Sequence, residues 1–199
     1  MKSLLLASLL IFMYISLYAQ DTLPLFSKAP LFETTDASGH KVSLQQLLQK
    51  GPVVISFYRG QWCPYCNRHM SNLQDSLSFI TSLGASLVAI TPEKNEEISK
   101  TISKTGAAFS IIYDEGHRIM DAYKVTFKVD GFKNLLHFAE GVNINKASGN
   151  TDNVLPVPAT YIIDQDGRII GRQFDRDYTI RMPVKDILKV LKKYNAEKR

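Results

Sequence analysis

The alternation of short apolar runs with helical patterns is the feature that most limits the folds open to this chain. Residues 53–58 (VVISFY) and 86–91 (SLVAIT) are apolar, β-rich runs, which is typical of buried strands. Residues 109–113 (FSIIY) form a third run of this kind. Stretches with helical spacing separate the three runs. Strands that alternate with helices predict an α/β sandwich.

Two further patterns extend this architecture. Residues 159–164 (ATYIID) and 168–173 (RIIGRQ) flank a turn at Asp166 and Gly167, which predicts a hairpin and therefore a mixed sheet. Pro183 precedes a last helix with apolar residues at helical spacing. We also expect extended pieces at 31–34 and 41–43, helices at 44–49, around 93–104 and at 117–123, and an insertion of loops and short elements at 125–157.

A helix is predicted to begin at Pro64 and to continue as far as Gly84. The apolar residues on its predicted inner face are Cys66, Met70, Leu73, Leu77 and Ile80. This pattern places Cys66 on the side of the helix that faces the core. Cys63 lies just before the helix, after the strand at 53–58.

The first twenty residues differ from the rest of the chain. Lys2 precedes an uncharged apolar run that is too short for a comfortable membrane span and ends near Ala19. We interpret residues 1–20 as a secretory signal peptide and 21–199 as a single domain, exported and periplasmic, without stable membrane association after cleavage. An uncleaved membrane anchor is the alternative. No cysteine follows the run, which excludes a lipid-modified N-terminus.

Composition narrows the function classes. With 45% apolar and 22% charged residues, the chain has enough apolar residues for an ordinary globular core. The formal net charge of +5 is modest, and the basic residues are scattered rather than arranged with aromatic residues in a stripe. We therefore expect no nucleic-acid partner.

The chain has two cysteines, Cys63 and Cys66, and the spacing alone allows three interpretations. A structural zinc site needs four ligands, but no second CxxC is present and the histidines at 40, 69, 117 and 137 are widely spread. A structural disulfide would close only a very short loop, which stabilises a fold little. The third interpretation is a redox-active pair, with no metal and no other cofactor.

Position favours the redox pair. A cysteine at the start of a helix is close to unsatisfied N–H groups and to the positive end of the helix dipole, which stabilise a thiolate. Pro64 is suited to the first helical position. Arg59 adds a positive charge nearby in the sequence. We therefore expect Cys63 to be an exposed thiolate and Cys66 to be its shielded partner.

A proline at the start of the hairpin also fits a site at this end of the sheet. Pro158 lies immediately before the predicted strand at 159–164. An X-Pro bond at this point can be held cis and present its backbone to a neighbouring site, although proline is also common simply where a strand begins.

The order and spacing of several segments resemble the thioredoxin-fold superfamily. These segments are APLFETTDASGHKVSL, VVISFYRGQWCPYC and VPATYIIDQDGRI. More narrowly, RGQWCPYCNRH, LVAITPEK, FSIIYDEGHRIMDAYKV and DYTIRMP are similar to the peroxiredoxin-like branch of the AhpC/TSA family. The resemblance implies a thioredoxin-like α/β sandwich, with a mixed central sheet flanked by helices, and a strengthened expectation of a cis bond at Pro158.

The resemblance also implies a thiol peroxidase that reduces hydrogen peroxide and organic hydroperoxides to water and alcohols. Cys63 would form a sulfenic acid and then a disulfide with Cys66, and a thioredoxin-like dithiol would reduce that disulfide. Supporting positions in the matching motifs are Gly60, Trp62 and Pro64.

Two departures from the family pattern concern peroxide activation. Typical members have a proline seven residues and a threonine three residues before the attacking cysteine, where this chain has Ser56 and Gly60. They also have an arginine near the position of Pro158. We hypothesise that another arginine replaces the missing guanidinium. The candidates are Arg59 and three arginines of the segment GRQFDRDYTIR, namely Arg172, Arg176 and Arg181.

Two other functions remain open. An exported thiol–disulfide oxidoreductase, with protein disulfides as substrates, would use the same two cysteines. A non-enzymatic binding module on the same fold is the third class, and it would need neither cysteine. The preferred peroxide, the reductant and the oligomeric state do not follow from the sequence.

Overall fold

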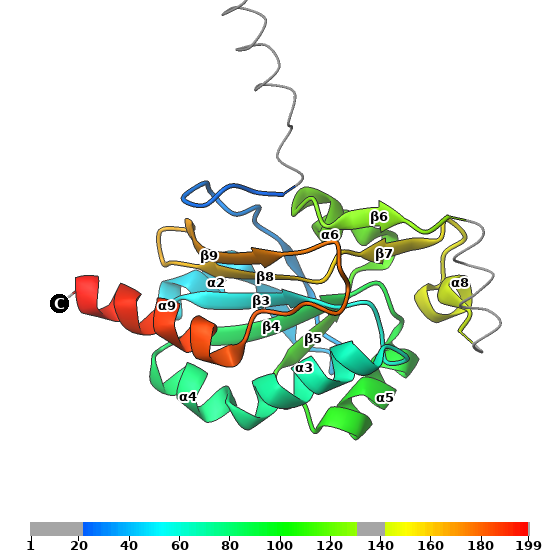
Figure 1. The fold of residues 1–199 in the computed structure, drawn as a ribbon, viewed down its shortest axis with the longest axis horizontal. Coiled ribbons are helices and arrows are strands. Elements are labelled where there is room, and N and C mark those ends of the chain that lie inside the picture. Colours follow the sequence, from blue (N-terminus) through cyan, green and yellow to red (C-terminus); the bar gives the residue numbers. More distant parts are fainter. Residues whose placement is uncertain (1–21, 131–141, 199) are drawn as a thin grey trace, which may run out of the picture.

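A mixed five-stranded sheet lies at the centre of the computed structural model, which describes residues 22–130 and 142–198 (Figure 1). Its strands, in spatial order, are β5 (Ser110–Tyr113), β4 (Ser86–Thr91), β3 (Val53–Phe57), β8 (Ala159–Ile163) and β9 (Ile169–Phe174). The first three run parallel, whereas β8 is antiparallel to both β3 and β9. The predicted hairpin and the mixed α/β sheet are confirmed.

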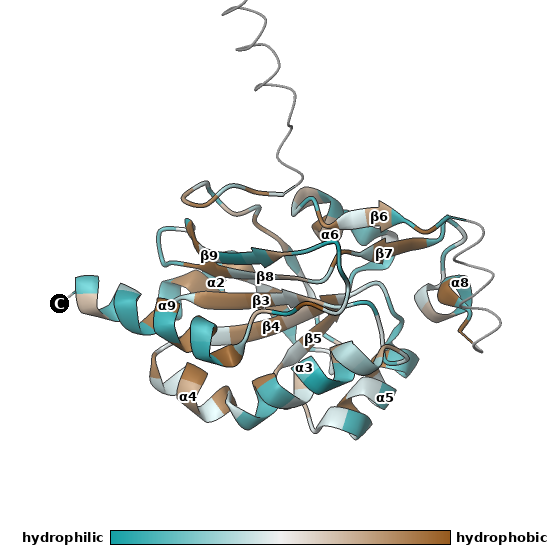
Figure 2. Ribbon diagram, viewed as in Figure 1, coloured by the Kyte–Doolittle hydropathy of each residue, from teal (hydrophilic) through white to brown (hydrophobic). Residues whose placement is uncertain are grey.

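Helices cover both faces of this sheet, because alternate residues of its strands point to opposite sides. Ile55 and Phe57 of β3 belong to the core cluster beneath α2 (Leu44–Lys50) and α6 (Arg118–Ala122). Val54 belongs to the second cluster, on the face covered by four other helices. These are α3 (Pro64–Asp75), α4 (Leu77–Ser82), α5 (Asn95–Thr105) and α9 (Val184–Glu197). Figure 2 shows β3 as a hydrophobic strand, while α3 and α9 carry many hydrophilic residues.

Short elements lie around this core. They are β1 (Glu33–Thr35), β2 (Lys41–Ser43), the 3₁₀ turn η1 (Glu115–His117), β6 (Thr126–Lys128), α8 (Ile144–Ser148) and β7 (Val154–Pro156). The pairs β1–β2 and β6–β7 are antiparallel ladders. The last three elements lie within the predicted insertion at 125–157, whose residues 131–141 are outside the described part of the chain.

The predicted helix from Pro64 to Gly84 is wrong in one respect, because it is two helices. Ser76, with φ −105° and ψ 5°, ends α3 and precedes α4. Leu73 and Ile80 nevertheless pack in the same core cluster. The bend therefore lets both helices remain against the twisted sheet.

The Val157–Pro158 bond is trans, because the described residues contain no cis peptide bond. The expectation of a cis bond is therefore wrong. Pro158 is buried and directly precedes Ala159, which pairs with Phe57 at the end of β3. Its place near the cysteine loop is thus as expected, while its backbone geometry is not.

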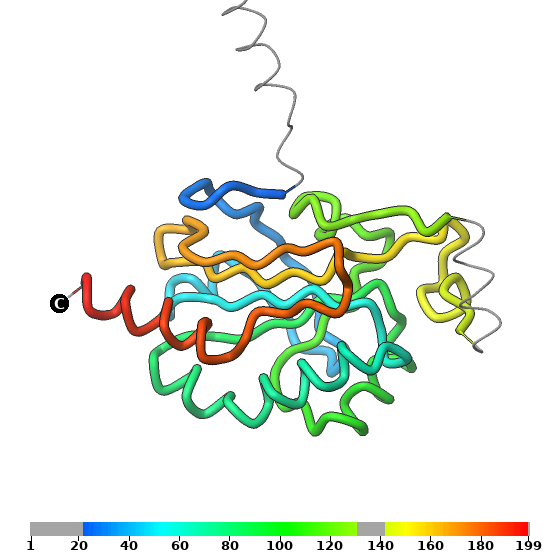
Figure 3. The backbone as a smooth tube through the Cα atoms, in the orientation of Figure 1, coloured from blue at the N-terminus to red at the C-terminus, as the bar shows by residue number. Residues whose placement is uncertain are grey.

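The segment between β9 and α9 leads back toward the cysteines, and Figure 3 follows it from the end of β9 into the last helix. Pro183 is the N-cap of α9. Within residues 22–130 and 142–198, no helix has the length and apolarity needed to cross a bilayer. The predicted signal peptide at 1–20 lies outside the described residues, so the division into signal peptide and single domain stays a prediction.

Candidate functional site

The two cysteines lie where β3 passes through a short loop into α3. Cys63 is the N-cap of α3 and Pro64 occupies its first turn, as the sequence predicts. The loop is closed by a hydrogen bond from the Cys63 N–H to the Gly60 carbonyl, at 3.1 Å. The Asn67 side chain donates to the Gln61 carbonyl at 2.7 Å. These contacts fix the loop against the first turn of the helix.

Both cysteines are reduced and both are buried. Cys63 is 1% exposed and Cys66 is 0% exposed, and both belong to the core cluster beneath α3. The expectation of an exposed Cys63 is therefore wrong. The physical reason is that the Cys63 sulfur turns inward, to a hydrogen bond with Cys66, rather than outward to solvent.

The hydrogen bond between the two thiols determines where the first negative charge lies. Burial alone would raise the pKa of Cys66, but the hydrogen bond from Cys63 and the guanidinium of Arg181 lower it. The hydrogen bond with Cys66 raises the pKa of Cys63, and burial raises it further. These contacts favour the negative charge on Cys66 in the resting pair, and the reactive thiolate expected on Cys63 stays a prediction.

Of the four arginines considered from the sequence, the structure places two at the cysteines. Arg181 donates from Nη2 to the Cys66 Sγ at 3.2 Å, although it lies far along the chain. Arg59 is 4% exposed and interacts electrostatically with both cysteines. Arg172 is directed elsewhere, because its Nη1 donates to the Leu23 carbonyl at 2.6 Å.

Aromatic rings hold Arg59 in place. Its guanidinium carbon lies 4.8 Å from the centroid of the Trp62 ring and 4.6 Å from that of the Tyr178 ring. Tyr178 in turn makes an edge-to-face contact with Tyr65, with centroids 5.9 Å apart. Burial lowers the pKa of Arg59, and negative charge on the cysteines opposes this shift. Two cation–π contacts thus position a largely desolvated cation beside the thiols.

The buried carboxyl of Glu93 holds the loop that precedes Cys63 through a hydrogen bond. Glu93 is 2% exposed and follows β4, and its Oε2 accepts the Gln61 N–H at 2.7 Å. Burial raises the pKa of Glu93 to about 8. Gly60, at φ +159°, makes this approach possible, because a Cβ there would lie 2.4 Å from the Glu93 Oε1. The predicted importance of Gly60 therefore has a steric basis.

Ser56 lies in β3, and Pro158 directly precedes β8, at the positions where family members have other residues. Ser56 is 1% exposed and pairs with Thr160 across β3 and β8. Neither Ser56 nor Gly60 brings a described hydroxyl hydrogen bond to the cysteines. The charged groups that the structure places at the cysteine pair are the guanidinium groups of Arg59 and Arg181.

Sequence reasoning missed Glu93, Tyr178 and His69. Glu93 was detectable, because it follows β4 and the ends of parallel strands meet at one edge of a sheet. His69 is 5% exposed and lies three residues after Cys66 on α3. Tyr178 lies in the segment DYTIRMP that carries the family resemblance, but its contact with Arg59 depends on how the segment before α9 returns to α3.

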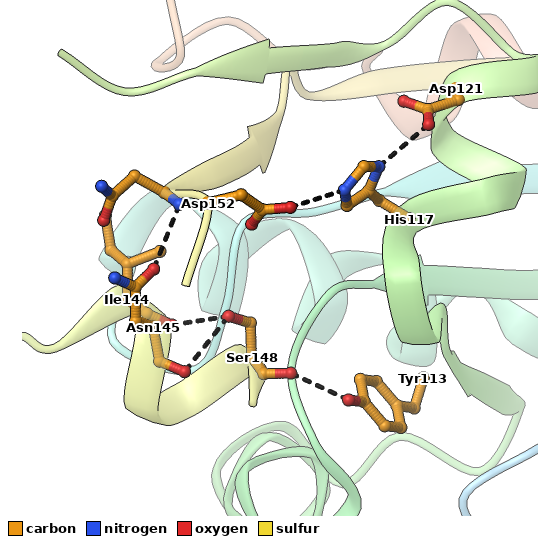
Figure 4. Close-up of polar contacts among 8 residues, drawn as sticks. Tyr113, His117, Asp121, Ile144, Asn145, Ser148 and Asp152 are labelled. Atoms are coloured by element: carbon orange, nitrogen blue, oxygen red, sulfur yellow. Dashed lines mark hydrogen bonds and ion pairs between the residues drawn. The ribbon is translucent and has the colours of Figure 1, made fainter. Parts of the chain in front are cut away.

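A second polar cluster lies outside the cysteine site (Figure 4). His117 contacts Asp121 through Nδ1 at 2.9 Å and Asp152 through Nε2 at 2.8 Å. Tyr113 donates to the Ser148 carbonyl at 2.8 Å. These bonds fasten the segment around α8 to η1 and α6. Among the residues that the structure describes, no group of three or more His, Cys, Asp and Glu side chains is arranged to hold a metal ion.

The chain matches known proteins over most of its length. The model of the AhpC/TSA family matches residues 26–172. A protein of Mycobacterium tuberculosis named as a peroxiredoxin is 24% identical over 148 residues, which are 74% of this chain and 83% of the relative. The thiol-disulfide oxidoreductase ResA of Bacillus thuringiensis is 22% identical over 152 residues, which are 76% of this chain and 70% of the relative.

Solved structures show the same fold. Peroxidoxin BcpB of Mycobacterium tuberculosis superimposes with a TM-score of 0.68 at 17% identity, covering 86% of this chain and 97% of that one. A thiol:disulfide interchange protein of Chlorobium tepidum gives a TM-score of 0.57 at 16% identity, covering 86% and 97% of the two chains. The chain therefore belongs to the AhpC/TSA family and has the thioredoxin-like fold of the peroxiredoxins.

Proposed function

We propose that this protein is a thiol peroxidase that reduces hydrogen peroxide and organic hydroperoxides with the dithiol of Cys63 and Cys66. The observation that carries the proposal is the convergence of Arg59 and Arg181 on a reduced, buried cysteine pair. A guanidinium can polarise a peroxide and stabilise the charge of a departing alkoxide. These two arginines supply what the threonine and arginine of typical family members supply elsewhere.

The geometry suggests how the proton moves. Cys66 holds the charge in the resting pair and accepts the Cys63 proton as the Cys63 sulfur attacks the outer peroxide oxygen. The O–O bond breaks, Cys63 becomes a sulfenic acid, and the alkoxide takes the proton back from Cys66 and leaves as an alcohol. The Cys66 thiolate then attacks the Cys63 sulfur and expels hydroxide, which takes a proton from solvent and leaves as water.

The resulting disulfide must be reduced for turnover. The net reaction oxidises the dithiol by two electrons and converts one hydroperoxide to an alcohol and one water. A thioredoxin-like dithiol is the expected reductant, and it would attack the Cys63–Cys66 disulfide through a mixed disulfide. Family membership supports this partner, as peroxiredoxin-named proteins are among the relatives.

A thiol–disulfide oxidoreductase is the second candidate function. Two observations favour it: the ResA proteins among the relatives, and Gly60 in place of the peroxide-binding threonine. In that reaction Cys63 would attack a protein disulfide and Cys66 would release the mixed disulfide. A binding module that uses no thiol chemistry is the third candidate function. It requires that Cys63→Ser and Cys66→Ser leave the function of the protein unchanged.

The rate of disulfide formation separates these functions. Reduced protein is mixed with one equivalent of hydrogen peroxide or cumene hydroperoxide, and the Cys63–Cys66 disulfide is followed by mass spectrometry beside an unfolded control. Oxidation orders of magnitude faster than the control supports the peroxidase. Oxidation at the control rate, with rapid exchange against a protein disulfide, assigns the chain to the oxidoreductases.

We propose that residues 1–20 direct export to the periplasm and are removed. The apolar run after Lys2 supports this proposal. An exported peroxidase lies outside the cytosolic thiol pool, so its dithiol would be supplied by a membrane-bound donor. Cell fractionation with N-terminal sequencing tests the location, and a cytosolic, uncleaved chain would contradict it.

A further inference from the structure

A pocket opens beside the cysteine pair, between α3 and the segment that leads into α9. Its volume is about 390 Å³. Its lining residues are Tyr65, Arg68, His69 and Asn72 of α3, followed by Thr179, Arg181, Met182, Pro183 and Val184. Two distant parts of the chain therefore form its two walls.

Positive and hydrogen-bonding groups dominate these walls. Arg68 and Arg181 line the pocket, and no aspartate or glutamate does. Asp177 interacts with Arg181 electrostatically, but its carboxylate accepts the N–H and hydroxyl of Thr179 and does not line the cavity. The pocket thus suits a ligand that carries a negative charge.

The buried His69 side chain in the pocket wall has a polar atom without a hydrogen-bond partner among the described residues. His69 is 5% exposed, and its Nε2 has no hydrogen-bond partner among the described residues. An unsatisfied buried polar atom costs free energy, and a ligand that pairs with it regains that cost. Burial lowers the pKa of His69 to about 4, with a further effect of Arg181, so the imidazole is neutral near pH 7. A neutral imidazole with its proton on Nε2 donates a hydrogen bond to a carboxylate.

Arg181 joins this pocket to the reactive sulfur. The same guanidinium lines the cavity and donates to the Cys66 Sγ at 3.2 Å. Arg68 and His69 lie on the opposite wall, which belongs to α3. A molecule that contacts both walls therefore meets Arg181, which hydrogen-bonds Cys66, on one side and Arg68 and His69 on the other.

The volume of the pocket indicates the size of this molecule. A cavity of about 390 Å³ is more than ten times the ~30 Å³ share of one water molecule. Hydrogen peroxide would fill little of it. Pockets of this volume usually hold small organic molecules.

We propose that this pocket binds the carboxylate of an organic hydroperoxide, through Arg68 and His69, and directs its peroxide end toward Arg181 and the cysteines. The inference rests on the proposed peroxidase function and names its substrate class. The preferred substrates are then small hydroperoxides that carry an acid group, and neutral hydroperoxides are poorer substrates.

A binding experiment tests the pocket without any turnover. Benzoate is titrated into the reduced full-length protein and followed by calorimetry, with benzyl alcohol as the uncharged analogue. We expect benzoate to bind and benzyl alcohol to bind much more weakly. Arg68→Ala is expected to weaken benzoate binding about fivefold, the effect of losing one exposed ion pair. Lys185→Ala, an exposed cation of α9 outside the pocket, is the matched control and leaves binding unchanged.

The imidazole of His69 provides a second readout. Its NMR signal, assigned with His69→Gln, is titrated with pH in the absence and presence of benzoate. A bound carboxylate favours the protonated ring, so benzoate is expected to raise the pKa of His69 and leave that of His117 unchanged. A His69 pKa that does not respond to benzoate would mean that the anion binds elsewhere.

Kinetics then test the substrate class. Cumene hydroperoxide is compared with its para-carboxylate derivative in kcat/KM. We expect the carboxylate derivative to be several-fold better, and this advantage to be lost in Arg68→Ala but kept in Lys185→Ala.

The two proposals fail in different ways. If neither peroxide is consumed but benzoate binds through Arg68, the peroxidase function and the substrate assignment are wrong. If both peroxides are consumed equally and benzoate does not bind, only the pocket inference is wrong. Tighter binding of inorganic phosphate than of benzoate would also overturn the assignment to a carboxylate.

Discussion

The guanidinium of Arg181 lies 3.2 Å from the sulfur of Cys66 and donates a hydrogen bond to it. The two residues are far apart in the chain, and the return of the segment before α9 brings them together. This contact lowers the pKa of Cys66 and favours negative charge on the more deeply buried of the two cysteines. A buried thiolate of this kind depends on its partners, because burial alone would disfavour it.

Replacing Arg181 should move the titration of the pair. In Arg181→Gln the positive charge beside Cys66 is lost, so we expect the pKa of Cys66 to rise by roughly one unit or more. Since the thiolate forms as the pH rises through this pKa, the variant holds less thiolate at pH 7. The measurement is the thiolate absorbance near 240 nm of the reduced protein as a function of pH.

Three variants serve as controls for this titration. Arg172→Gln removes a guanidinium that binds Leu23, and it should leave the curve unchanged. Cys63→Ser should keep a low-pH thiolate step, and Cys66→Ser should lose it. The reverse result would place the charge on Cys63 and contradict its assignment to Cys66.

Glu93 should make the protein less stable as the pH rises. Burial raises its pKa from 4.5 to about 8, so between these values the folded protein retains a proton that the unfolded chain releases. Stability is therefore highest below pH 4.5 with respect to this group, and falls by about 1.4 kcal/mol per pH unit up to about pH 8. Glu93→Gln should lack this dependence.

Urea unfolding of both proteins between pH 5 and 8 measures the difference. The stability of wild type relative to Glu93→Gln is expected to decrease with pH. Glu96→Gln, an exposed carboxyl in the first turn of α5, is the matched control and should follow wild type. A constant difference between wild type and Glu93→Gln would show that Glu93 is ionised throughout.

Gly60→Ala should destabilise the loop that precedes Cys63. The new Cβ would lie 2.4 Å from the Glu93 Oε1, and the backbone has φ +159°. We expect a loss of about 2–4 kcal/mol from strain and steric overlap together. Gly39→Ala separates the two causes, because Gly39 has φ +89° but no atom within 4 Å of a Cβ.

Thermal and urea unfolding of the two alanine variants provide the comparison. The excess loss in Gly60→Ala over Gly39→Ala measures the overlap with the Glu93 carboxyl and with Trp62 Nε1, which would lie 2.6 Å from the new Cβ. In the double variant with Glu93→Ala the Glu93 part of this excess should be relieved. Equal losses at Gly60 and Gly39 would mean that both side chains move away at no cost.

His117 should hold the segment around α8 more tightly at low pH. Burial alone would lower the pKa of His117, but its hydrogen bonds to Asp152 and Asp121 raise it, and Asp114 adds a further negative charge nearby. The stabilisation is complete below the ordinary histidine pKa of 6.5 and is lost as the pH rises through the raised value.

Amide hydrogen exchange of residues 143–153 measures how strongly His117 stabilises this segment at each pH. Protection factors, corrected for the intrinsic rate, should fall between pH 6 and pH 8 in wild type and be low at both values in His117→Gln. His40→Gln changes an exposed histidine and is the control. Protection factors that are the same at both pH values would show that protonation of His117 does not stabilise this segment.

The sheet, its order of elements and the start of α3 follow from local patterns. The apolar runs at 53–58, 86–91 and 109–113 are strands because they are buried on both faces, and Pro64 is in the first helical turn because its ring suits that position. Such features depend on near neighbours in the chain, and near neighbours are visible in a sequence.

The features that depend on distant neighbours were not predictable. Cys63 is buried because its sulfur meets Cys66 in a core that several helices complete, and no local pattern states this. The break at Ser76 adjusts a helix to a twisted sheet. Arg181 and Tyr178 reach the cysteines only through the path of the chain after β9.

The single tryptophan of the chain combines both kinds of feature, because it has contacts with near and with distant neighbours in the chain. Trp62 directly precedes Cys63 and packs both on the core cluster beneath α3 and on the small cluster of Val129, Ile144 and Leu155. Its ring also stacks on Arg59. Excitation at wavelengths that tyrosine does not absorb yields emission from this indole alone, because it is the single tryptophan of the chain. The emission of Trp62 is therefore expected to change when the neighbouring Cys63–Cys66 disulfide forms or is reduced. Stopped-flow fluorescence would then measure the rates of both reactions.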